Sequence, residues 1–308
     1  MAASRSATAD QSGAGPAPSG AGSSRLRRAG TYAALVPFFV YIGAFLLLPT
    51  LIVAIGAFQD AGGGVTLANL EVALTQKTFV DAFARSLQLS VVTALAGAIL
   101  GGLLAWAVAA GNPDGLLRHV VVAASGVLAQ FGGVMLAFAF LATFGFNGLV
   151  TVFIDDVLGL DVLSGGTWIY GLTGLAVVYT YFQIPLMVIV FLPAIDGLRK
   201  EWWDASASLG GSSWAYWRHV GGPILAPSFL GAVLLLFTNA FSAYATAAAL
   251  VSQGAPIIPL QIRTALSSEV ILGQANVGKA LALGMVVVVS IVMALYAVIQ
   301  RRASKWLR

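Results

Sequence analysis

The chain contains no cysteine, and only 9% of its 308 residues carry a charged side chain. Without cysteine it forms no disulfide and offers no thiol nucleophile or thiolate metal ligand. A soluble domain carries charge on about a quarter of its residues. The shortage of charge, with 59% hydrophobic residues and a mean hydropathy of +0.90, indicates that most of the chain faces lipid or other apolar helices.

Six apolar runs are long enough to cross a bilayer, which takes roughly 20 residues. They cover residues 32–58, 86–110, 119–144, 168–195, 224–251 and 277–299. The sequence therefore predicts an all-α integral membrane protein with six transmembrane helices over residues 31–308. Residues 1–30 are mostly Ala, Gly, Ser and Pro, a composition that predicts a disordered cytoplasmic tail and not a signal peptide.

Lysine and arginine are distributed unevenly between the loops. If both termini are cytoplasmic, twelve of the 16 bases lie on the cytoplasmic side, and the outer side holds Lys77, Arg85, Arg263 and Lys279. Basic residues concentrate in the cytoplasmic loops of membrane proteins. We therefore expect a multi-pass protein in contact with membrane lipid, with both termini in the cytoplasm. The loop after the third run carries Asp155, Asp156 and Asp161 and no base.

Acidic side chains are missing from the centres of the apolar runs. A proton- or sodium-coupled carrier usually keeps an ionisable residue there. Their absence, and the lack of an internal repeat, argue against a secondary carrier. A separate source of energy is then expected.

Sites for nucleotides and metals are also missing. The stretch from Gly273 to Ala280 matches a nucleotide-binding loop except at its last position, where Ala280 replaces the Ser or Thr that holds magnesium. His119 and His219 are far apart, with no second ligand at metal-binding spacing. We expect no cofactor, no metal site, no enzymatic activity and no nucleic-acid partner.

The most distinctive segment, residues 201–223, lies between the fourth and fifth apolar runs and reads EWWDASASLGGSSWAYWRHVGGP. Asp204 is expected to cap the start of one helix, and Gly210 to break it. Ser212 is expected to cap a second helix, which Pro223 ends. The residues alone fit equally well an amphipathic connector that lies on the bilayer surface.

The order of residues in this segment resembles the EAA loop of permease subunits of ATP-binding cassette (ABC) importers. That loop reads Glu-Ala-Ala, three residues, Gly, nine residues, Ile, one residue and Leu-Pro. The corresponding positions here, at the same spacing, are Asp204, Ala205, Ser206, Gly210, Val220, Gly222 and Pro223. The stretches YTYFQIPLMVIVFLP and FGFNGLV also look like sequences of this family, and the resemblance covers about residues 86–301.

The resemblance implies a type I importer permease of the MetI-like fold in a bacterial cell membrane. It implies that the segment couples to a dimer of cytoplasmic ATP-binding subunits, through Asp204, Ala205, Ser206, Gly210, Val220 and Pro223. It also implies a second permease subunit, identical or similar, and an extracytoplasmic solute-binding protein. The polyamine permeases look most similar, so the expected solute is a polyamine or a similar small molecule. Iron, thiamine, phosphonate, sulfate and sugar importers are the alternatives.

Polar side chains within the apolar runs are the candidates for contact with the solute. They are Tyr179, Tyr181, Gln183, Asn239, Ser242 and Tyr244. Each of them is also of a type that bonds neighbouring helices together. Gly97 and Gly101 form a GxxxG step, which predicts a close approach of two helices, although this motif is also common in apolar segments by chance. The alternative from another class is a membrane scaffold without transport, which the spacing of the EAA-like segment argues against.

Overall fold

The computed structural model describes residues 35–60, 62–159, 168–251, 257–267 and 274–304. Within them the chain is helical, apart from turns and one isolated β-bridge between Gln59 and Val65. The chain divides into two compact units, Met1–Ile52 and Val53–Arg308. The tail expected over residues 1–30 lies outside the described residues, as does Asp161.

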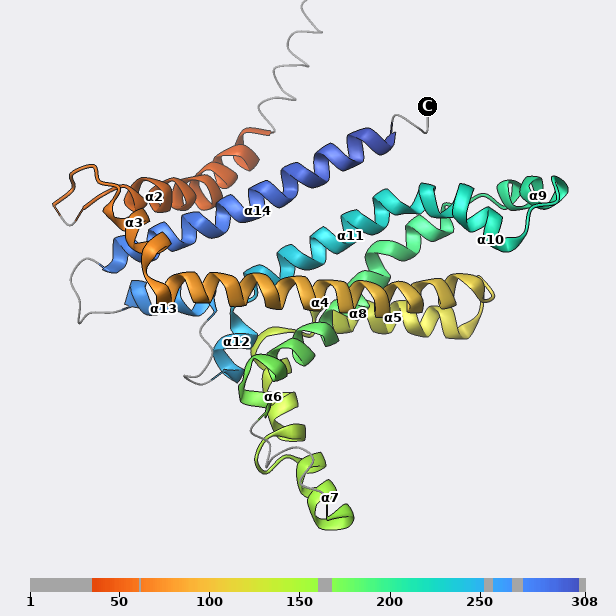
Figure 1. Cartoon of the computed structure of the whole chain (residues 1–308), viewed down its shortest axis with the longest axis horizontal. Helices are drawn as coiled ribbons and strands as arrows, with labels where there is room; N and C mark the ends of the chain where they lie inside the picture. The colour runs from red at the N-terminus through yellow and green to blue at the C-terminus, as the bar shows by residue number, and fades with distance from the viewer. Residues whose placement is uncertain (1–34, 61, 160–167, 252–256, 268–273, 305–308) are drawn as a thin grey trace, which may run out of the picture. The chain divides into compact units, whose positions relative to one another are not determined.

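The first unit is helical from residue 35 and includes a π-helical stretch, Gly43–Leu47. Helix α2 (Leu48–Ala57) follows and ends in the second unit. The second unit continues with α3 (Ala68–Thr75), α4 (Lys77–Ala110), α5 (Leu116–Gln130), α6 (Gly133–Phe144), α7 (Leu149–Leu158), α8 (Leu172–Asp196), α9 (Lys200–Ser208), α10 (Ser213–Tyr216), a π-helix (Trp217–Gly221), α11 (Gly222–Ser242), α12 (Ala245–Leu250), α13 (Ile258–Ser267) and α14 (Gln274–Ser304) (Figure 1).

Six of the described helical runs are long and apolar enough to cross a membrane. They are Leu35–Ala57, Lys77–Ala110, Gly133–Val157, Leu172–Asp196, Ser213–Ser242 and Ala275–Val298. The predicted all-α architecture with six membrane-spanning helices is confirmed.

The boundaries of three predicted spans were wrong. The run at 119–144 is not one helix, because α5 and α6 are separated at Phe131–Gly132, and Gly133 has φ +69°, a left-handed angle that favours glycine. The run at 224–251 is interrupted at Ala243 and Tyr244, between α11 and α12. Helix α4 begins at Lys77, well before the predicted start, because its first turns bury Phe79 and Ala82 in a cluster shared with α14.

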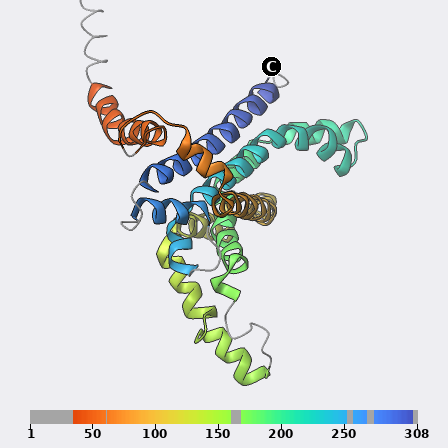
Figure 2. The same cartoon turned by 60° about the vertical axis from the view of Figure 1, so that its left-hand side comes forward.

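The centre of the second unit is the crossing of α4 with α8 and α11. Figure 2 looks almost along α4, and both other helices contact it. A Cβ atom placed on Gly97 would lie 2.5 Å from Gln183 Cβ, and one on Gly101 would lie 2.6 Å from the Ile184 carbonyl oxygen. The close approach expected of this GxxxG step is confirmed.

Basic residues lie at both ends of this unit. Arg118 at the start of α5 pairs with Asp196 at the end of α8, and Arg199 and Lys200 follow directly. The bases assigned to the other side of the membrane, Lys77, Arg85, Arg263 and Lys279, lie on α4, α13 and α14. The starting turns of α4 pack with α13 and α14 at the opposite end of the unit.

Candidate coupling segment and solute-path residues

The segment between α8 and α11 folds as two helices joined by a glycine turn. Helix α9 ends at Ser208, and Gly210 adopts φ +78°, so the predicted break at Gly210 is confirmed. The amide of Gly210 donates to the Ala207 carbonyl at 2.9 Å, and that of Gly211 to the Ser206 carbonyl at 2.9 Å. These bonds satisfy carbonyls at the end of α9, as left-handed glycines commonly do.

The second helix has the predicted cap. Ser212 Oγ accepts a hydrogen bond from the amide of Ala215 at 3.2 Å. This bond satisfies one of the amides that the first turn of α10 leaves without a helical partner.

Asp204 does not cap a helix, and the prediction that it does was wrong. Helix α9 begins at Lys200, so Glu201 occupies its first turn and Asp204 lies in its middle. The carbonyl of Asp204 accepts a hydrogen bond from Ser208 Oγ at 2.9 Å, while its side chain is exposed. The carboxylate is therefore presented on the outer surface of α9.

Pro223 does not end the second helix, contrary to the prediction. Helical structure runs from Ser213 to Ser242, and Pro223 lies in the first turn of α11. The π-helix Trp217–Gly221 precedes it directly. Because proline has no amide hydrogen, it breaks the regular bonding of a helix, and the wider π turn lets the chain pass this point without ending.

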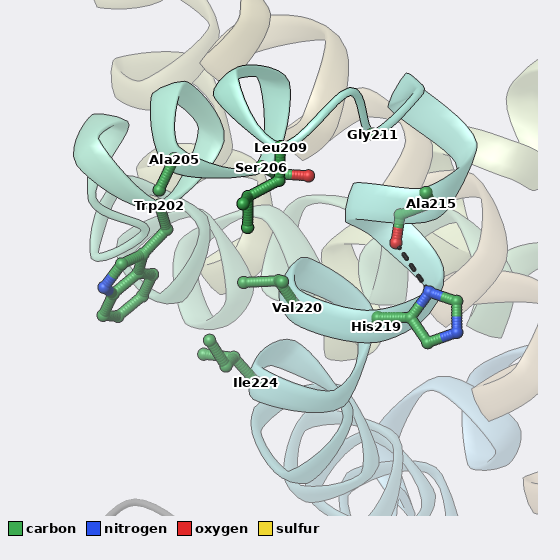
Figure 3. A pocket seen from close by; sticks show the side chains of 9 residues that line it. All are labelled: Trp202, Ala205, Ser206, Leu209, Gly211, Ala215, His219, Val220 and Ile224. Carbon is green, nitrogen blue, oxygen red and sulfur yellow. Dashed lines mark hydrogen bonds between the residues drawn. The ribbon is translucent and has the colours of Figure 1, made fainter.

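The two parts of the segment enclose an open, mostly apolar groove of about 450 Å³, which we call the coupling groove (Figure 3). Its walls are Trp202, Ala205, Ser206, Leu209, Gly211, Ala215, His219, Val220 and Ile224. The structure therefore brings together Ala205, Ser206 and Val220 of the predicted set. Gly210 forms the turn beside the groove, while Asp204 and Pro223 do not line it. His219 also lines the groove, where its Nδ1 lies 3.0 Å from the Ala215 carbonyl oxygen.

Two of the predicted path residues are buried within the bundle. The Tyr179 hydroxyl donates to the Ala243 carbonyl at 2.6 Å, across the break between α11 and α12. Gln183 is fully buried, with its amide between Thr93 Oγ1 at 3.1 Å and the Leu236 carbonyl oxygen at 3.0 Å. In this conformation both side chains join helices to one another, and neither is accessible to a solute.

Tyr181 lies on a different face of α8. The residue is 37% exposed, and its ring meets Phe140 of α6 edge to face, with centroids 5.5 Å apart. Together with Thr173, Ala176, Val177, Thr180 and Ile184, these two residues line an open cleft of about 430 Å³. Phe140 was missed by the sequence analysis, because an apolar residue in an apolar run carries no signal of its own.

The remaining path candidates are exposed on or near α11. Asn239 and Ser242 lie one turn apart, and the Ser242 hydroxyl bonds back to the Thr238 carbonyl at 2.9 Å. Tyr244 is 36% exposed, and the Arg263 guanidinium lies 6.0 Å above its ring. The six predicted residues are therefore divided between a buried group and two exposed groups.

Metal ligands do not gather anywhere in the part of the chain that the structure describes: no three His, Asp or Glu side chains come together to hold an ion.

No family model matches the chain. It is 30% identical to the thiamine transport system permease protein ThiP of Brucella suis over 103 residues, which are 33% of this chain and 18% of that protein. It is 29% identical to the probable starch degradation products transport system permease protein AmyD of Thermoanaerobacterium thermosulfurigenes over 179 residues, which are 51% of this chain and 60% of that protein. The chain thus spans less than two thirds of the length of either relative.

Solved structures extend the similarity over most of the chain. A chain of a bacterial ABC transporter involved in the import of the acidic polysaccharide alginate superposes with a TM-score of 0.75 at 16% identity, over 91% of this chain and 98% of that one. In complex with an alginate pentasaccharide-bound periplasmic protein, the alginate transporter gives a TM-score of 0.71 at 18% identity, over 92% of this chain and 98% of that one. The chain has the all-helical fold seen in ABC importer permeases.

Proposed function

We propose that this chain is the transmembrane permease subunit of an ABC importer and forms half of the solute path. The observation that carries the proposal is the segment from Lys200 to Gly221, a helix, a left-handed glycine and a capped helix, held between two membrane-spanning helices. It stands in a fold that an alginate importer shares. ATP hydrolysis is assigned to a separate cytoplasmic subunit.

The position of α9 suits a mechanical link. It follows the end of α8 after three residues, and through α10 and the π-helix it continues into α11. Both α8 and α11 pack on α4 in the middle of the bundle. A force that moves α9 is therefore transmitted to the central helices, and Asp204 on its exposed surface is proposed to bond a basic group of the ATP-binding subunit.

The assembly that this function requires is a proposal as well. It contains a dimer of ATP-binding subunits, a second permease subunit and a solute-binding protein. The alginate transporter supports the last of these, since it was solved with its periplasmic protein.

For the solute we propose a small organic cation, the chemistry that polyamines and thiamine share. Aromatic faces attract cations, and Tyr181, Phe140 and Tyr244 are the rings near the exposed path candidates. The polyamine assignment rests on sequence resemblance alone, whereas the relatives described above are named for thiamine and for starch products.

Co-expression with candidate ATP-binding subunits tests the permease assignment. The tagged chain is expected to co-elute with one such subunit, and cells that express both with the binding protein should take up a labelled solute. A panel of putrescine, thiamine and maltotriose then separates a cation from a sugar. Failure to retain any ATP-binding subunit would contradict the permease assignment, whereas uptake of maltotriose alone would contradict only the choice of a cation.

A further inference from the structure

A second groove lies beside α9 and is lined by Lys200 and Trp203 of that helix. It has a volume of about 260 Å³ and is lined by the end of α4, the end of α8 and the residues after it, Trp203 of α9, and the aromatic pair Tyr216 and Trp217. We call it the interfacial groove. It shares no lining residue with the coupling groove.

The walls of the interfacial groove are aromatic. Trp106 of α4 is 50% exposed, and Trp203 is 39% exposed. The rings of Trp203 and Tyr216 meet edge to face with centroids 4.9 Å apart, and those of Tyr216 and Trp217 do so at 5.5 Å. This packing fixes one wall. Tryptophan and tyrosine concentrate where a membrane protein meets the lipid headgroups.

The charge lining the groove is positive. Arg199 and Lys200 line it, and no acidic side chain does. Of the acids nearby in sequence, Asp196 pairs with Arg118, while Asp114, Glu201 and Asp204 are exposed and do not line the groove. The Arg199 guanidinium lies 5.8 Å from the centroid of the Trp202 ring, which lines the coupling groove, so Arg199 stands between the two grooves.

An apolar track leads from the groove along the membrane-spanning part of α4. Ile99, Leu103 and Trp106 follow one another at helical spacing, with 55%, 58% and 50% of their surface exposed. The interfacial groove and this track together complement a phospholipid. The basic residues match an anionic headgroup, and the apolar track matches an acyl chain.

We propose that the interfacial groove binds an anionic phospholipid. Arg199 and Lys200 bond its phosphate, Trp106 and Trp203 pack against its glycerol backbone, and an acyl chain lies along α4 over Leu103 and Ile99. A free phosphate would use the two bases but not the aromatic walls or the track. The site requires only that the chain spans a membrane, so it does not depend on which solute is carried.

Lipid retention by the purified full chain tests this proposal. Native mass spectrometry is expected to show phosphatidylglycerol bound in preference to phosphatidylcholine with the same acyl chains. The double variant Arg199→Gln and Lys200→Gln should bind phosphatidylglycerol about thirtyfold more weakly, the loss expected when two basic contacts to an anionic lipid are removed. Lys77→Gln with Arg85→Gln is the matched control, because it removes two bases at the other end of α4 and should change nothing.

Trp106→Ala provides a second test that leaves both bases in place. It should weaken phosphatidylglycerol binding severalfold, because it removes one wall of the groove. Glycerol phosphate, which has no acyl chain, should not displace the bound lipid. Equal retention of phosphatidylcholine, unchanged binding by the double variant, or full displacement by glycerol phosphate would each overturn the proposal.

Discussion

At the scale of single residues, the turn between α9 and α10 depends on Gly210. Its φ of +78° lies in the left-handed region, where a side chain costs about 1–2 kcal/mol. No atom lies within 4 Å of a Cβ placed there, so the backbone angle and not crowding restricts this position. A side chain at this position therefore strains the turn without disturbing the core.

Gly210→Val is expected to leave the protein in the membrane but to lower solute uptake severalfold, because α9 and α10 lose their fixed angle. Gly210→Asn should retain most uptake, since asparagine tolerates the left-handed region. Gly126→Val is the matched control, because Gly126 also has open space around its Cβ position but lies within α5. Uptake and membrane content are measured together in cells. Normal uptake by Gly210→Val would contradict the proposal that this turn takes part in coupling.

Asp204 gives a second test at the same scale. Because its carboxylate is exposed in the middle of α9, Asp204→Lys should not change the thermal stability of the isolated chain. It should instead reduce co-elution with the ATP-binding subunit, by repulsion of a basic partner. Asp204→Glu keeps the charge and serves as control. If Asp204→Lys co-elutes at the level of the unaltered chain, the proposed ion pair is wrong.

At the scale of helices, hydropathy located most of the membrane spans but not their interruptions. The breaks after Gln130 and after Ser242 lie within long apolar runs, so a hydropathy window that spans a whole run does not locate them. Gly132 and Gly133 mark one of these breaks, but glycines are common in this chain and many others lie inside helices. The π-helix before Pro223 depends on how α11 enters the bundle, which short-range sequence patterns do not encode.

The crossing of α4 and α8 gives the prediction for this scale. Gly101→Ala should lower the free energy of unfolding by about 1–3 kcal/mol, because its Cβ would lie 2.6 Å from a backbone carbonyl of α8 that cannot rotate away. The adjacent Gly102→Ala is the control, since its Cβ would lie 3.4 Å from the Phe229 ring, an ordinary contact. Unfolding of the purified variants in mild detergent compares the two. If the two variants unfold with equal free energies, α4 and α8 can move apart at Gly101 without a measurable loss of stability.

At the scale of the whole molecule, the two helices and the glycine turn between α8 and α11 could be predicted from sequence, whereas the burial of the proposed path residues could not. Gly210 and Ser212 act locally, so their types and spacing were sufficient. Tyr179, Tyr181 and Gln183 lie within five residues, yet Tyr181 is exposed while the other two are buried. That division depends on which face of α8 packs against α4 and α12, and a uniformly apolar run does not reveal it.

Orientation in the membrane is the last property to test, and the distribution of bases makes the prediction. Arg118, Arg199, Lys200 and Arg218 lie on the elements around the α4–α5 turn and the coupling segment, which the positive-inside rule places in the cytoplasm. Because the chain has no cysteine, single cysteines can be introduced at exposed positions without a background signal. In intact cells an impermeant maleimide should label Asp156→Cys and Thr264→Cys.

Ser208→Cys should react only after the cells are permeabilised, because α9 must lie on the side of the membrane where ATP is available. All three positions are exposed in the isolated chain, so a difference in labelling reports the membrane side and not burial by the protein itself. Labelling of Ser208→Cys in intact cells, with Asp156→Cys protected, would reverse the orientation. It would also place the coupling groove outside the cell, where an ATP-binding subunit cannot reach it, and the proposed importer mechanism would then be untenable.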